Sequence, residues 1–319
     1  MRDACVQVLM DIARQDKRVM LLTGDLGFKV LTPFAATFPD QFLNVGVAEQ
    51  NMTGVATGLA LEGKIVFTYS IGNFPTLRCL EQIRNDVCYH NANVKIVCIG
   101  GGFCYGPLGI SHHATEDLAI MRVLPQMQVM APGDLTETRL VTRMAYETHG
   151  PCYLRLGRGG EPDIHLKPIH FSWGQGIPLF PQGDVALLST GGILINAVRA
   201  REMLENQGIS ASLHSLPFLQ PLDMGLLEEL ARTSRLVVTI EEHSIIGGLG
   251  GAVAEVLAEF LGPKAPLVRL GLREGFSCEV GDQEYLREIY GLSPGAIVRR
   301  VKEVLSIIQP EAKNNGVSD

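Results

Sequence analysis

The sequence predicts an α/β protein made of two domains, each built on a parallel sheet with helices on its faces. Three observations lead to this fold class. Short runs rich in Val, Ile and Leu alternate with longer segments of helical periodicity, a pattern typical of strands that helices cover on both sides. The alternation stops once, over residues 161–183, and then resumes. With 319 residues, 46% of them hydrophobic and 19% charged, the chain is large enough to bury two cores.

The first domain is expected over residues 1–160, where apolar runs and helical segments alternate from the N-terminus. The apolar runs predict strands at Val19–Gly24, Lys64–Tyr69, Val94–Gly100, Met127–Ala131 and Cys152–Leu156. The periodic segments predict helices at Asp3–Arg14, Val47–Leu61, Pro75–Asn91, Glu116–Val123 and Leu135–Thr148. Together these elements complete one layered unit.

Residues 161–183 are expected to form a linker, because four prolines and several glycines interrupt the periodic pattern there. A second, smaller α/β domain is expected over residues 184–310. Its predicted strands are Val185–Thr190, Ser210–Leu216, Leu236–Glu241 and Pro266–Leu272. Its predicted helices are Ile193–Gln207, Leu226–Arg232, Leu249–Leu261 and Pro294–Ile308. The polar tail, residues 311–319, is expected to be disordered.

The charge balance argues against a nucleic-acid partner. The formal net charge is −7 and Lys and Arg form no run, whereas nucleic-acid binders carry a basic patch. No stretch of about 18 uncharged apolar residues is present, and the acidic Asp3 stands where a signal peptide would be basic and then apolar. We therefore expect no membrane partner and a cytoplasmic location.

The common motifs of several enzyme classes are missing. Seven scattered cysteines include no Cys-x-x-Cys pair, which indicates reduced, mostly buried thiols rather than a zinc or redox site. No P-loop, Gly-x-Ser-x-Gly elbow or His-Glu-x-x-His sequence occurs. The glycines of residues 247–251 do not complete a dinucleotide fingerprint, since Val253 stands where its last glycine belongs. We expect them to let a helix pack close to the sheet or to another subunit.

One predicted helix has an unusual start. Glu49, Gln50 and Asn51 follow one another at the beginning of a segment that is otherwise apolar and rich in small residues. Two interpretations of Glu49 are open. It is either an N-terminal acid that interacts favourably with the helix dipole, or a desolvated carboxylate at an interface that carries a proton.

The segment from Gly46 to Met52, with the glycine-rich helix that follows, resembles the segment bearing the catalytic glutamate in thiamine-diphosphate enzymes of the transketolase group. Further segments agree with that group, in the same order, along nearly the whole chain. They are Arg2, Gly24-Asp25-Leu26, Phe74 to Arg78, residues 81–85, Ser111-His112-His113, Leu154 to Arg158 and Glu241-Glu242-His243. The resemblance implies a pyrimidine-binding domain, a C-terminal domain and transfer of a two-carbon ketol unit from a ketose to an aldose.

The resemblance implies that four residues serve the cofactor. Glu49 would hydrogen-bond the pyrimidine ring nitrogen of thiamine diphosphate and share a proton with it, which makes Glu49 a catalytic residue. Phe74 would stack on the aminopyrimidine, and Arg78 would border the same pocket. Asp25 matches a family aspartate near the cofactor. Without the resemblance, Phe74 is equally an ordinary core aromatic and Asp25 a turn-capping acid.

The resemblance also implies four substrate-binding residues. His112 would contact the substrate and assist proton transfer around its carbonyl and hydroxyl groups, and the adjacent His113 competes for that role. Arg158 would clamp a sugar phosphate, with Arg2 as a second candidate, because arginine presents the forked donors that phosphate needs. Taken alone, the two histidines would more often be structural and an arginine at a strand end a solvated charge.

Two departures limit what the resemblance implies. Leu108 stands where the group has an aspartate that reads a substrate hydroxyl, which favours a modified sugar over a pentose phosphate. The Gly-Asp-Gly sequence that holds the diphosphate through Mg²⁺ is also missing, because each of the four Gly-Asp pairs is followed by Leu, Val or Gln. We therefore assign no metal ligand to this chain. Mg²⁺ and the diphosphate are expected on a separate N-terminal transketolase subunit, in an α2β2 assembly.

Three other interpretations stay open at this point. The nearest is the beta subunit of a 2-oxo-acid dehydrogenase, which shares the two-domain plan and also lacks the diphosphate site. The others are half of an enzyme resembling deoxyxylulose-phosphate synthase, and a non-catalytic α/β binding protein, since a fold alone does not fix an activity. The Leu-Gly-Arg sequence ending at Arg158 favours phosphosugar chemistry and hence a transketolase.

Overall fold

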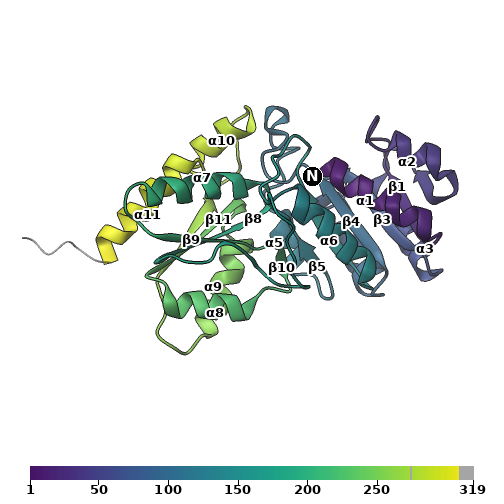
Figure 1. Cartoon of the computed structure of the whole chain (residues 1–319). Helices are drawn as coiled ribbons and strands as arrows, with labels where there is room; N and C mark the ends of the chain where they lie inside the picture. The colour runs from purple at the N-terminus through teal and green to yellow at the C-terminus, as the bar shows by residue number, and fades with distance from the viewer. Residues whose placement is uncertain (274, 309–319) are drawn as a thin grey trace, which may run out of the picture.

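The computed structural model describes residues 1–273 and 275–308, and it contains two α/β domains side by side (Figure 1). The N-terminus lies between them, at the junction. The predicted fold class is therefore confirmed. The tail expected to be disordered, residues 311–319, lies outside the described residues.

The first domain is built on a seven-stranded sheet with the order β10-β5-β6-β4-β3-β1-β2. Its strands are β1 (Val19–Thr23), β2 (Phe42–Asn44), β3 (Ile65–Ile71), β4 (Val94–Ile99), β5 (Gln128–Met130), β6 (Cys152–Leu156) and β10 (Phe218–Gln220). All neighbours are parallel except β10, which pairs antiparallel with β5. The carboxyl ends of the parallel strands therefore meet at one edge, where the loops that follow them gather.

Helices cover both faces of this sheet, which explains why its strands are apolar throughout. Leu21 of β1 packs in the cluster that contains the first helix, whereas the next residue, Leu22, packs with Met52 on the opposite face. The helices are α1 (Arg2–Gln15), α2 (Thr32–Thr37), α3 (Glu49–Leu61), α4 (Leu80–Gln82), α5 (Asp117–Arg122) and α6 (Leu135–Glu147). Short turns of other helix types are η1 (Pro39–Gln41), η2 (Leu77–Cys79), η3 (Ile83–Cys88) and η4 (Gly106–Leu108).

The structure breaks the helix predicted at Pro75–Asn91 into three pieces. A 3₁₀ turn, η2, leads into the single turn of α4 and then into the π-helix η3. Before them, the Thr76 hydroxyl donates a hydrogen bond to the carbonyl of Gly72, 3.1 Å away, so the chain starts with a turn rather than a helix. The hydrophobic periodicity of the sequence does not reveal this break in the helix, although π-helical turns are common near functional sites.

The second domain is built on a five-stranded sheet with the order β12-β11-β8-β9-β7. Its strands are β7 (Ile177–Phe180), β8 (Val185–Thr190), β9 (Ala211–Ser215), β11 (Leu236–Ser244) and β12 (Leu267–Leu272). Only β7, at one edge, runs antiparallel to its neighbour. The helices are α7 (Leu194–Glu205), α8 (Met224–Thr233), α9 (Leu249–Glu259), α10 (Gln283–Ile289) and α11 (Pro294–Ile308), with the 3₁₀ turn η5 (Gly191–Ile193) before α7.

The glycines around the start of α9 let this helix approach β11 closely, as expected from the sequence. A Cβ on Gly248 would lie 2.1 Å from Oε2 of Glu241, and one on Gly250 would lie 2.9 Å from Oγ1 of Thr239. The buried carboxylate of Glu241 accepts hydrogen bonds from the backbone N–H groups of Leu249 and Gly250, at 2.6 and 2.7 Å. The Glu241 carboxylate thus accepts hydrogen bonds from the first N–H groups of α9, at a place where a side chain on Gly248 or Gly250 would not fit.

The segment expected to be a linker is more tightly integrated than the sequence indicates. Strand β7 lies within residues 161–183 and completes the second sheet, while β10, from beyond that segment, joins the first sheet. One apolar cluster includes residues of both domains, among them Met52 and Leu257. The division at residues 161–183 therefore does not separate two independent cores, because β10, from within residues 184–310, joins the first sheet and one apolar cluster spans both domains.

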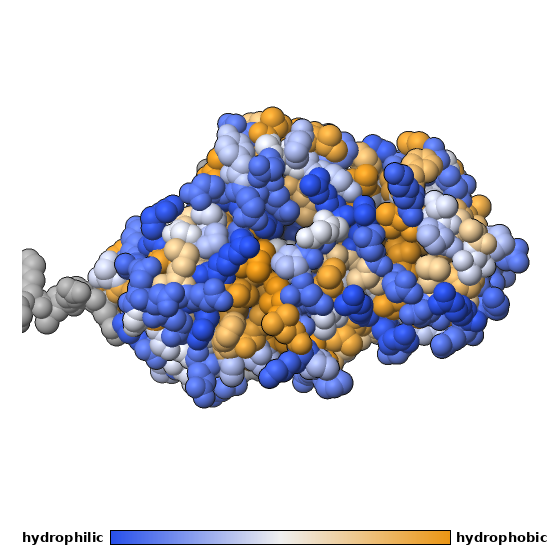
Figure 2. Space-filling view, turned by 45° about the horizontal axis from the view of Figure 1, so that its top comes forward, coloured by the Kyte–Doolittle hydropathy of each residue, from blue (hydrophilic) through white to orange (hydrophobic). Residues whose placement is uncertain are grey.

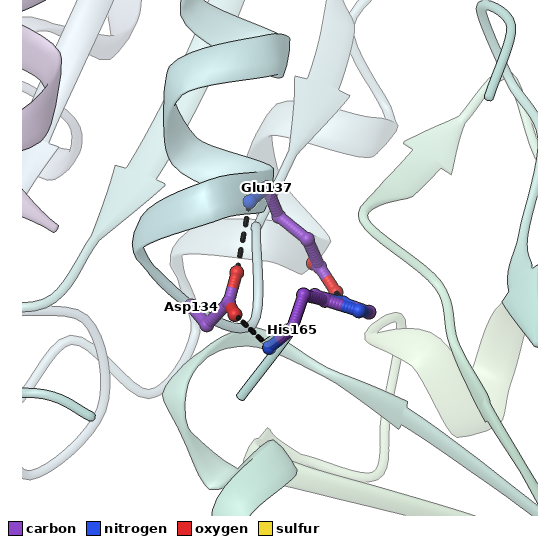
Figure 3. Close-up of side chains that lie close together, drawn as sticks. All are labelled: Asp134, Glu137 and His165. Carbon is purple, nitrogen blue, oxygen red and sulfur yellow. Dashed lines mark hydrogen bonds and ion pairs between the residues drawn. The ribbon is translucent and has the colours of Figure 1, made fainter. Parts of the chain in front are cut away.

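A cluster of three side chains fixes the start of this segment against α6 (Figure 3). Asp134 accepts backbone hydrogen bonds from Glu137, Ile164 and His165 at 2.8 to 2.9 Å. The two oxygens of Glu137 lie 2.8 Å from Nε2 of His165 and 2.6 Å from the backbone N–H of Gly133. Every carboxylate oxygen of Asp134 and Glu137 thus has a hydrogen-bond partner within the protein. The cluster holds the start of the segment against α6 rather than forming a metal site.

Six of the seven cysteines are buried free thiols and Cys278 is exposed, which agrees with the expectation of reduced, mostly buried thiols. Among the described residues, no helix combines the length and the apolar character that crossing a bilayer would require. The cytoplasmic location expected from the sequence stays a prediction.

Candidate active site

The residues singled out in the sequence gather at the carboxyl edge of the first sheet. Asp25 follows β1, Phe74 follows β3, His112 lies in the long loop after β4, and Arg158 follows β6. Glu49 is the first residue of α3, which follows β2. Because these strands are neighbours and run parallel, the topology brings the five positions to one side of the domain.

Glu49 is a buried carboxylate paired with a half-exposed arginine. Its side chain is 3% exposed, and Oε2 lies 2.6 Å from Nη1 of Arg78, whose side chain is 47% exposed. The Arg78 guanidinium carbon also lies 4.8 Å from the centre of the Phe74 ring. Burial of Glu49 agrees with a desolvated carboxylate, and its place as the first residue of α3 agrees equally with the helix-dipole interpretation.

Phe74 and His112 face one another across the site. Their ring centres are 5.2 Å apart in an edge-to-face arrangement, and the Tyr105 ring also contacts His112, with ring centres 6.2 Å apart. The His112 ring is partly buried, and Nδ1 lies 3.0 Å from the hydroxyl of Ser111. Burial, together with the nearby His113, lowers the pKa of His112, so the imidazole is neutral at neutral pH.

The structure corrects the substrate-binding role suggested for His113. This side chain is fully buried, with Nδ1 2.7 Å from the hydroxyl of Ser277 and Nε2 3.0 Å from the carbonyl oxygen of Gly106. Neither ring nitrogen is left for a substrate. Adjacent residues of an irregular loop point in different directions, and here the loop turns His112 toward the site and His113 into the protein.

Asp25 lies beside the segment that leads to Glu49, in an exposed turn. It has a positive φ of 57° and exchanges two hydrogen bonds with the amide of Asn44, at 2.9 and 3.0 Å. A Cβ on the preceding Gly24 would lie 3.6 Å from Cγ of Glu49. Asp25 therefore supports the backbone next to Glu49, as the turn-capping alternative describes, while its carboxylate stays accessible.

The two arginines suggested for phosphate binding lie near one loop. Arg158 is exposed directly after β6, and the Arg2 guanidinium lies 3.4 Å from the position of a Cβ on Gly159. Arg2 also pairs with Asp3 at 3.1 Å. Burial raises the pKa of Tyr105, and the positive charges of Arg2 and Arg158 oppose that rise; Tyr105 also contacts His112, so it connects this loop with the site.

Sequence reasoning missed three residues that shape the site. Asn73 donates a hydrogen bond to the carbonyl oxygen of His113 at 2.9 Å and so ties the loop after β3 to the loop after β4. Tyr105 and Asn44 have the contacts given above. None of them belongs to a motif. Asn73 and Tyr105 stand a few residues behind predicted strands, whereas Asn44 ends β2, which was not predicted.

The geometry of Glu49 fits the aminopyrimidine of thiamine diphosphate. A buried carboxylate needs a hydrogen-bond donor, and a half-exposed arginine provides it in this structure. A partly exposed aromatic ring, Phe74, stands next to the same group. If the Arg78 side chain moves toward solvent, the Glu49 carboxylate becomes a free hydrogen-bond acceptor beside the Phe74 ring. A protonated or amino-substituted heterocycle requires both, an acceptor for its N–H group and an aromatic ring to stack on.

Comparison with known proteins agrees with this arrangement. The family model of the transketolase pyrimidine-binding domain matches residues 1–161, and that of the transketolase C-terminal domain matches residues 174–297. A putative transketolase C-terminal section of Methanocaldococcus jannaschii is 40% identical over 307 residues, 95% of each chain. One of the subunits of an apulose-4-phosphate transketolase of Actinobacillus succinogenes is 37% identical, with 84% of this chain and 86% of that one covered. A 6-deoxy-6-sulfo-D-fructose transketolase subunit of a Clostridium species is 38% identical, with 95% and 94% covered.

Solved structures give the same result. A structure described as "Split gene transketolase, inactive beta4 tetramer" superposes with a TM-score of 0.86 at 40% identity, covering 97% of this chain and 98% of that one. A transketolase of Pichia stipitis shares the fold with a TM-score of 0.81 at 21% identity, and this chain spans 46% of it. The chain therefore belongs to the transketolase family, as a subunit that contains the pyrimidine-binding and C-terminal domains of a thiamine-diphosphate-dependent enzyme.

Proposed function

We propose that this chain is the pyrimidine-binding subunit of a split transketolase that moves a two-carbon ketol unit from an anionic ketose to an aldose. The observation that carries the proposal is the buried Glu49 carboxylate at one edge of the sheet: its partner Arg78 lies against the Phe74 ring, which in turn contacts His112. Relatives named for apulose-4-phosphate and for 6-deoxy-6-sulfo-D-fructose support substrates that bear a phosphate or a sulfonate.

Glu49 would hold the cofactor's pyrimidine through a shared proton. When bound, thiamine diphosphate supplies the electron sink for cleavage of the carbon–carbon bond. The Glu49 carboxylate would share a hydrogen bond with the ring nitrogen, and burial makes that hydrogen bond strong. Arg78 must leave Glu49 to admit the ring, and its exposure lets the guanidinium remain solvated when it does so. Phe74 stacks on the heterocycle, and Asp25 supports the edge of the pocket.

His112 would serve the substrate. Because its pKa is lowered, the neutral imidazole accepts a proton from a substrate hydroxyl and later returns it. Contacts with Phe74 and Tyr105 hold the ring in place, so the proton transfer takes place at a fixed position. The exposed side chain of Leu108, near this loop, offers no hydrogen bond to a sugar hydroxyl.

Arg158 would bind the anionic end of the sugar, with Arg2 behind the same loop. Strand β6, which precedes Arg158, lies two positions from β3, which precedes Phe74. At ~4.8 Å per strand the two ends are ~10 Å apart, which matches an extended five- or six-carbon sugar phosphate.

A second polypeptide would complete the site. We infer that an N-terminal transketolase subunit holds Mg²⁺ and the diphosphate, because no Gly-Asp-Gly sequence is present here. The related β4 tetramer is named as inactive, which supports the need for a second polypeptide. Helix α3 presents the exposed Gly54 and Gly58, with open space within 4 Å of a Cβ on either, and this small-residue surface supports contact between two copies in an α2β2 assembly.

The proposal is tested by replacing Glu49→Gln and, at the other end of the same helix, the exposed Glu62→Gln. Ketose cleavage is measured in the complex assembled with the N-terminal subunit. The first variant should lose roughly 100-fold or more in kcat because an amide cannot share the proton, while the second should match the wild type. Activity of the Glu49 variant near that of the wild type would rule out the role of Glu49.

The same assay separates the alternative donors. Relatives named 1-deoxy-D-xylulose-5-phosphate synthase, such as that of Heliobacterium modesticaldum at 33% identity, are matched over 46% of their length. A ketose donor should be cleaved and pyruvate should not. Turnover of pyruvate instead would favour the synthase-like half or a 2-oxo-acid dehydrogenase subunit.

A further inference from the structure

A cavity of about 670 Å³ lies at the outer edge of the second sheet, within the C-terminal domain. Its wall is formed by β12, which is the edge strand of that sheet, by the end of α10 and by the first half of α11. None of the residues assigned to the candidate active site lines it. Its volume lies in the range of small-molecule sites, so the cavity has room for a ligand of its own.

The wall of this cavity is positively charged. Three arginines line it, namely Arg269, Arg273 and Arg300, whereas no acidic side chain does so among residues 1–273 and 275–308. The Arg269 guanidinium donates a hydrogen bond of 3.0 Å to an uncharged acceptor, the carbonyl oxygen of Ile245. Arg300 pairs at 2.6 Å with the exposed Glu303, a kind of surface pair that contributes little and opens easily. An excess of arginine at one place in a chain of net charge −7 favours an anionic ligand.

The first turn of α11 adds to this positive character. Ala296, which lies in that turn, lines the cavity, and the helix runs for 15 residues. No acidic residue stands in the first turn, and the hydroxyl that accepts the Ala296 N–H at 3.3 Å, that of Ser293, is uncharged. The positive end of the helix dipole is therefore not offset by a negative charge in that turn. Arg300 follows one turn further along the same helix.

The rest of the wall is apolar. It is lined by Leu270 and Leu272 of β12 and by Ile289 and the Tyr290 ring at the end of α10. Hydrophilic and hydrophobic side chains likewise lie next to each other on the visible face of the C-terminal domain, at the left of Figure 2. The ligand that fits both parts of the wall is a small organic anion, with a phosphate or carboxylate group on a compact apolar body.

Tyr290 connects this cavity with the loop that presents His112. Its ring stacks on that of Phe103, with ring centres 5.2 Å apart and an angle of 20° between the planes. Phe103, which is fully buried, contacts the His113 ring edge to face, with ring centres 5.3 Å apart. His113 and His112 are neighbours in the sequence. A ligand that contacts Tyr290 is therefore linked to His112 through packed aromatic rings.

We propose that this cavity is an effector site for a small organic anion, and that its occupation changes the environment of His112 through the stacked rings. The anion site itself rests on the charge and shape of the wall. That the affected loop serves a substrate rests on the proposed function. Because such a coupling is reciprocal, a ligand bound at the His112 loop should change the affinity of the cavity for its anion by the same factor.

The site is tested on the full chain by calorimetric titration of phenyl phosphate at constant ionic strength. Arg300→Ala should weaken binding by about ten-fold, because it removes a charge-assisted contact. Arg299→Ala is the matched control, since that side chain is 72% exposed on the same helix and does not line the cavity, and it should leave the affinity unchanged. Arg158→Ala should leave the binding that depends on Arg300 in place.

A second titration tests the ligand class. Inorganic phosphate should bind about ten-fold more weakly than phenyl phosphate, because it buries no apolar surface against the wall. Equal affinity for the two probes would refute the apolar part of the site. Absence of saturable binding, or a loss caused by Arg158→Ala and not by Arg300→Ala, would overturn the effector site as a whole.

The link to His112 is read from the imidazole NMR signals of the full chain, without turnover. The signal that disappears in His112→Gln should shift when phenyl phosphate saturates the wild type. In Arg300→Ala, at the same probe concentration, the shift should be largely lost. Tyr290→Leu should bind the probe within about three-fold of the wild type and lose the shift. Where Tyr290→Leu does not fold, the Arg300→Ala comparison decides.

An unshifted His112 signal in the wild type would refute the coupling. A shift that persists in Arg300→Ala would place the probe at the candidate active site and refute it as well. If the assembled complex transfers no ketol unit but phenyl phosphate still binds through Arg300, the proposed function fails and the effector site stands.

Discussion

The Nδ1 atom of His113 lies 2.7 Å from the hydroxyl oxygen of Ser277, although 164 residues separate the two in the sequence. Both side chains are buried, and the Phe103 ring that packs on His113 also stacks on Tyr290 of the C-terminal domain. The C-terminal domain therefore holds the loop that presents His112 to the site.

Ser277→Ala should destabilise the protein by ~1 to 2 kcal/mol, because it leaves a buried imidazole nitrogen without its partner. The measurement is the free energy of unfolding in urea. The exposed Ser306→Ala is the control, and its change should lie within ~0.5 kcal/mol. Equal effects of both variants would mean that the Ser277 contact contributes nothing.

A second tie between the domains centres on Glu242. This buried carboxylate accepts hydrogen bonds from the backbone N–H of Phe103 and from Gln283, and it pairs with Arg287. Glu242→Gln should destabilise the chain by ~3 kcal/mol, since it leaves a buried guanidinium short of negative charge.

The control for this change is Glu255→Gln, which breaks the more exposed pair with Arg122. Its effect should stay below ~1 kcal/mol. If Glu242→Gln proved equally mild, the two domains would be held mainly by their shared apolar cluster.

His214 makes stability depend on pH. It is buried in β9 with neither ring nitrogen bonded among the described residues, and burial lowers its pKa from 6.5 to about 4. The unfolded chain then binds a proton at a higher pH than the folded chain does, so stability falls as the pH drops below 6.5 and levels off near pH 4.

From this group alone, the loss between pH 7 and pH 5 should be about 2 kcal/mol. His214→Leu should remove that part of the pH dependence, whereas replacement of the exposed His90 by Leu should leave it. Unfolding curves at pH 7 and pH 5 make the comparison. The same pH dependence in wild type and His214→Leu would contradict the assignment.

The isolated chain should bind thiamine diphosphate weakly. It offers a surface for the pyrimidine, while most of the anchoring charge belongs to the diphosphate and Mg²⁺. Calorimetric titration of the cofactor should show no magnesium-dependent binding in the micromolar range until the N-terminal subunit is added. Tight binding by the chain alone would place the diphosphate site here after all.

The sequence by itself determined the class and the order of most elements. Strands such as β6 and β8 are buried on both faces, so unbroken apolar runs mark them, and both have the predicted bounds. Helix α11 also has its predicted bounds, and it starts at Pro294 because proline favours the first turn of a helix. The short antiparallel edge strands β7 and β10 escaped prediction, since three or four residues carry no periodicity.

For the site, motif order along the chain identified Glu49, Phe74 and His112, but the tertiary structure decided what surrounds them. The pair between Glu49 and Arg78 and the burial of His113 against Ser277 each join segments far apart in the sequence. Local patterns report which face of an element is apolar. They do not report which distant loop supplies a charge, because that depends on how the two domains pack against each other.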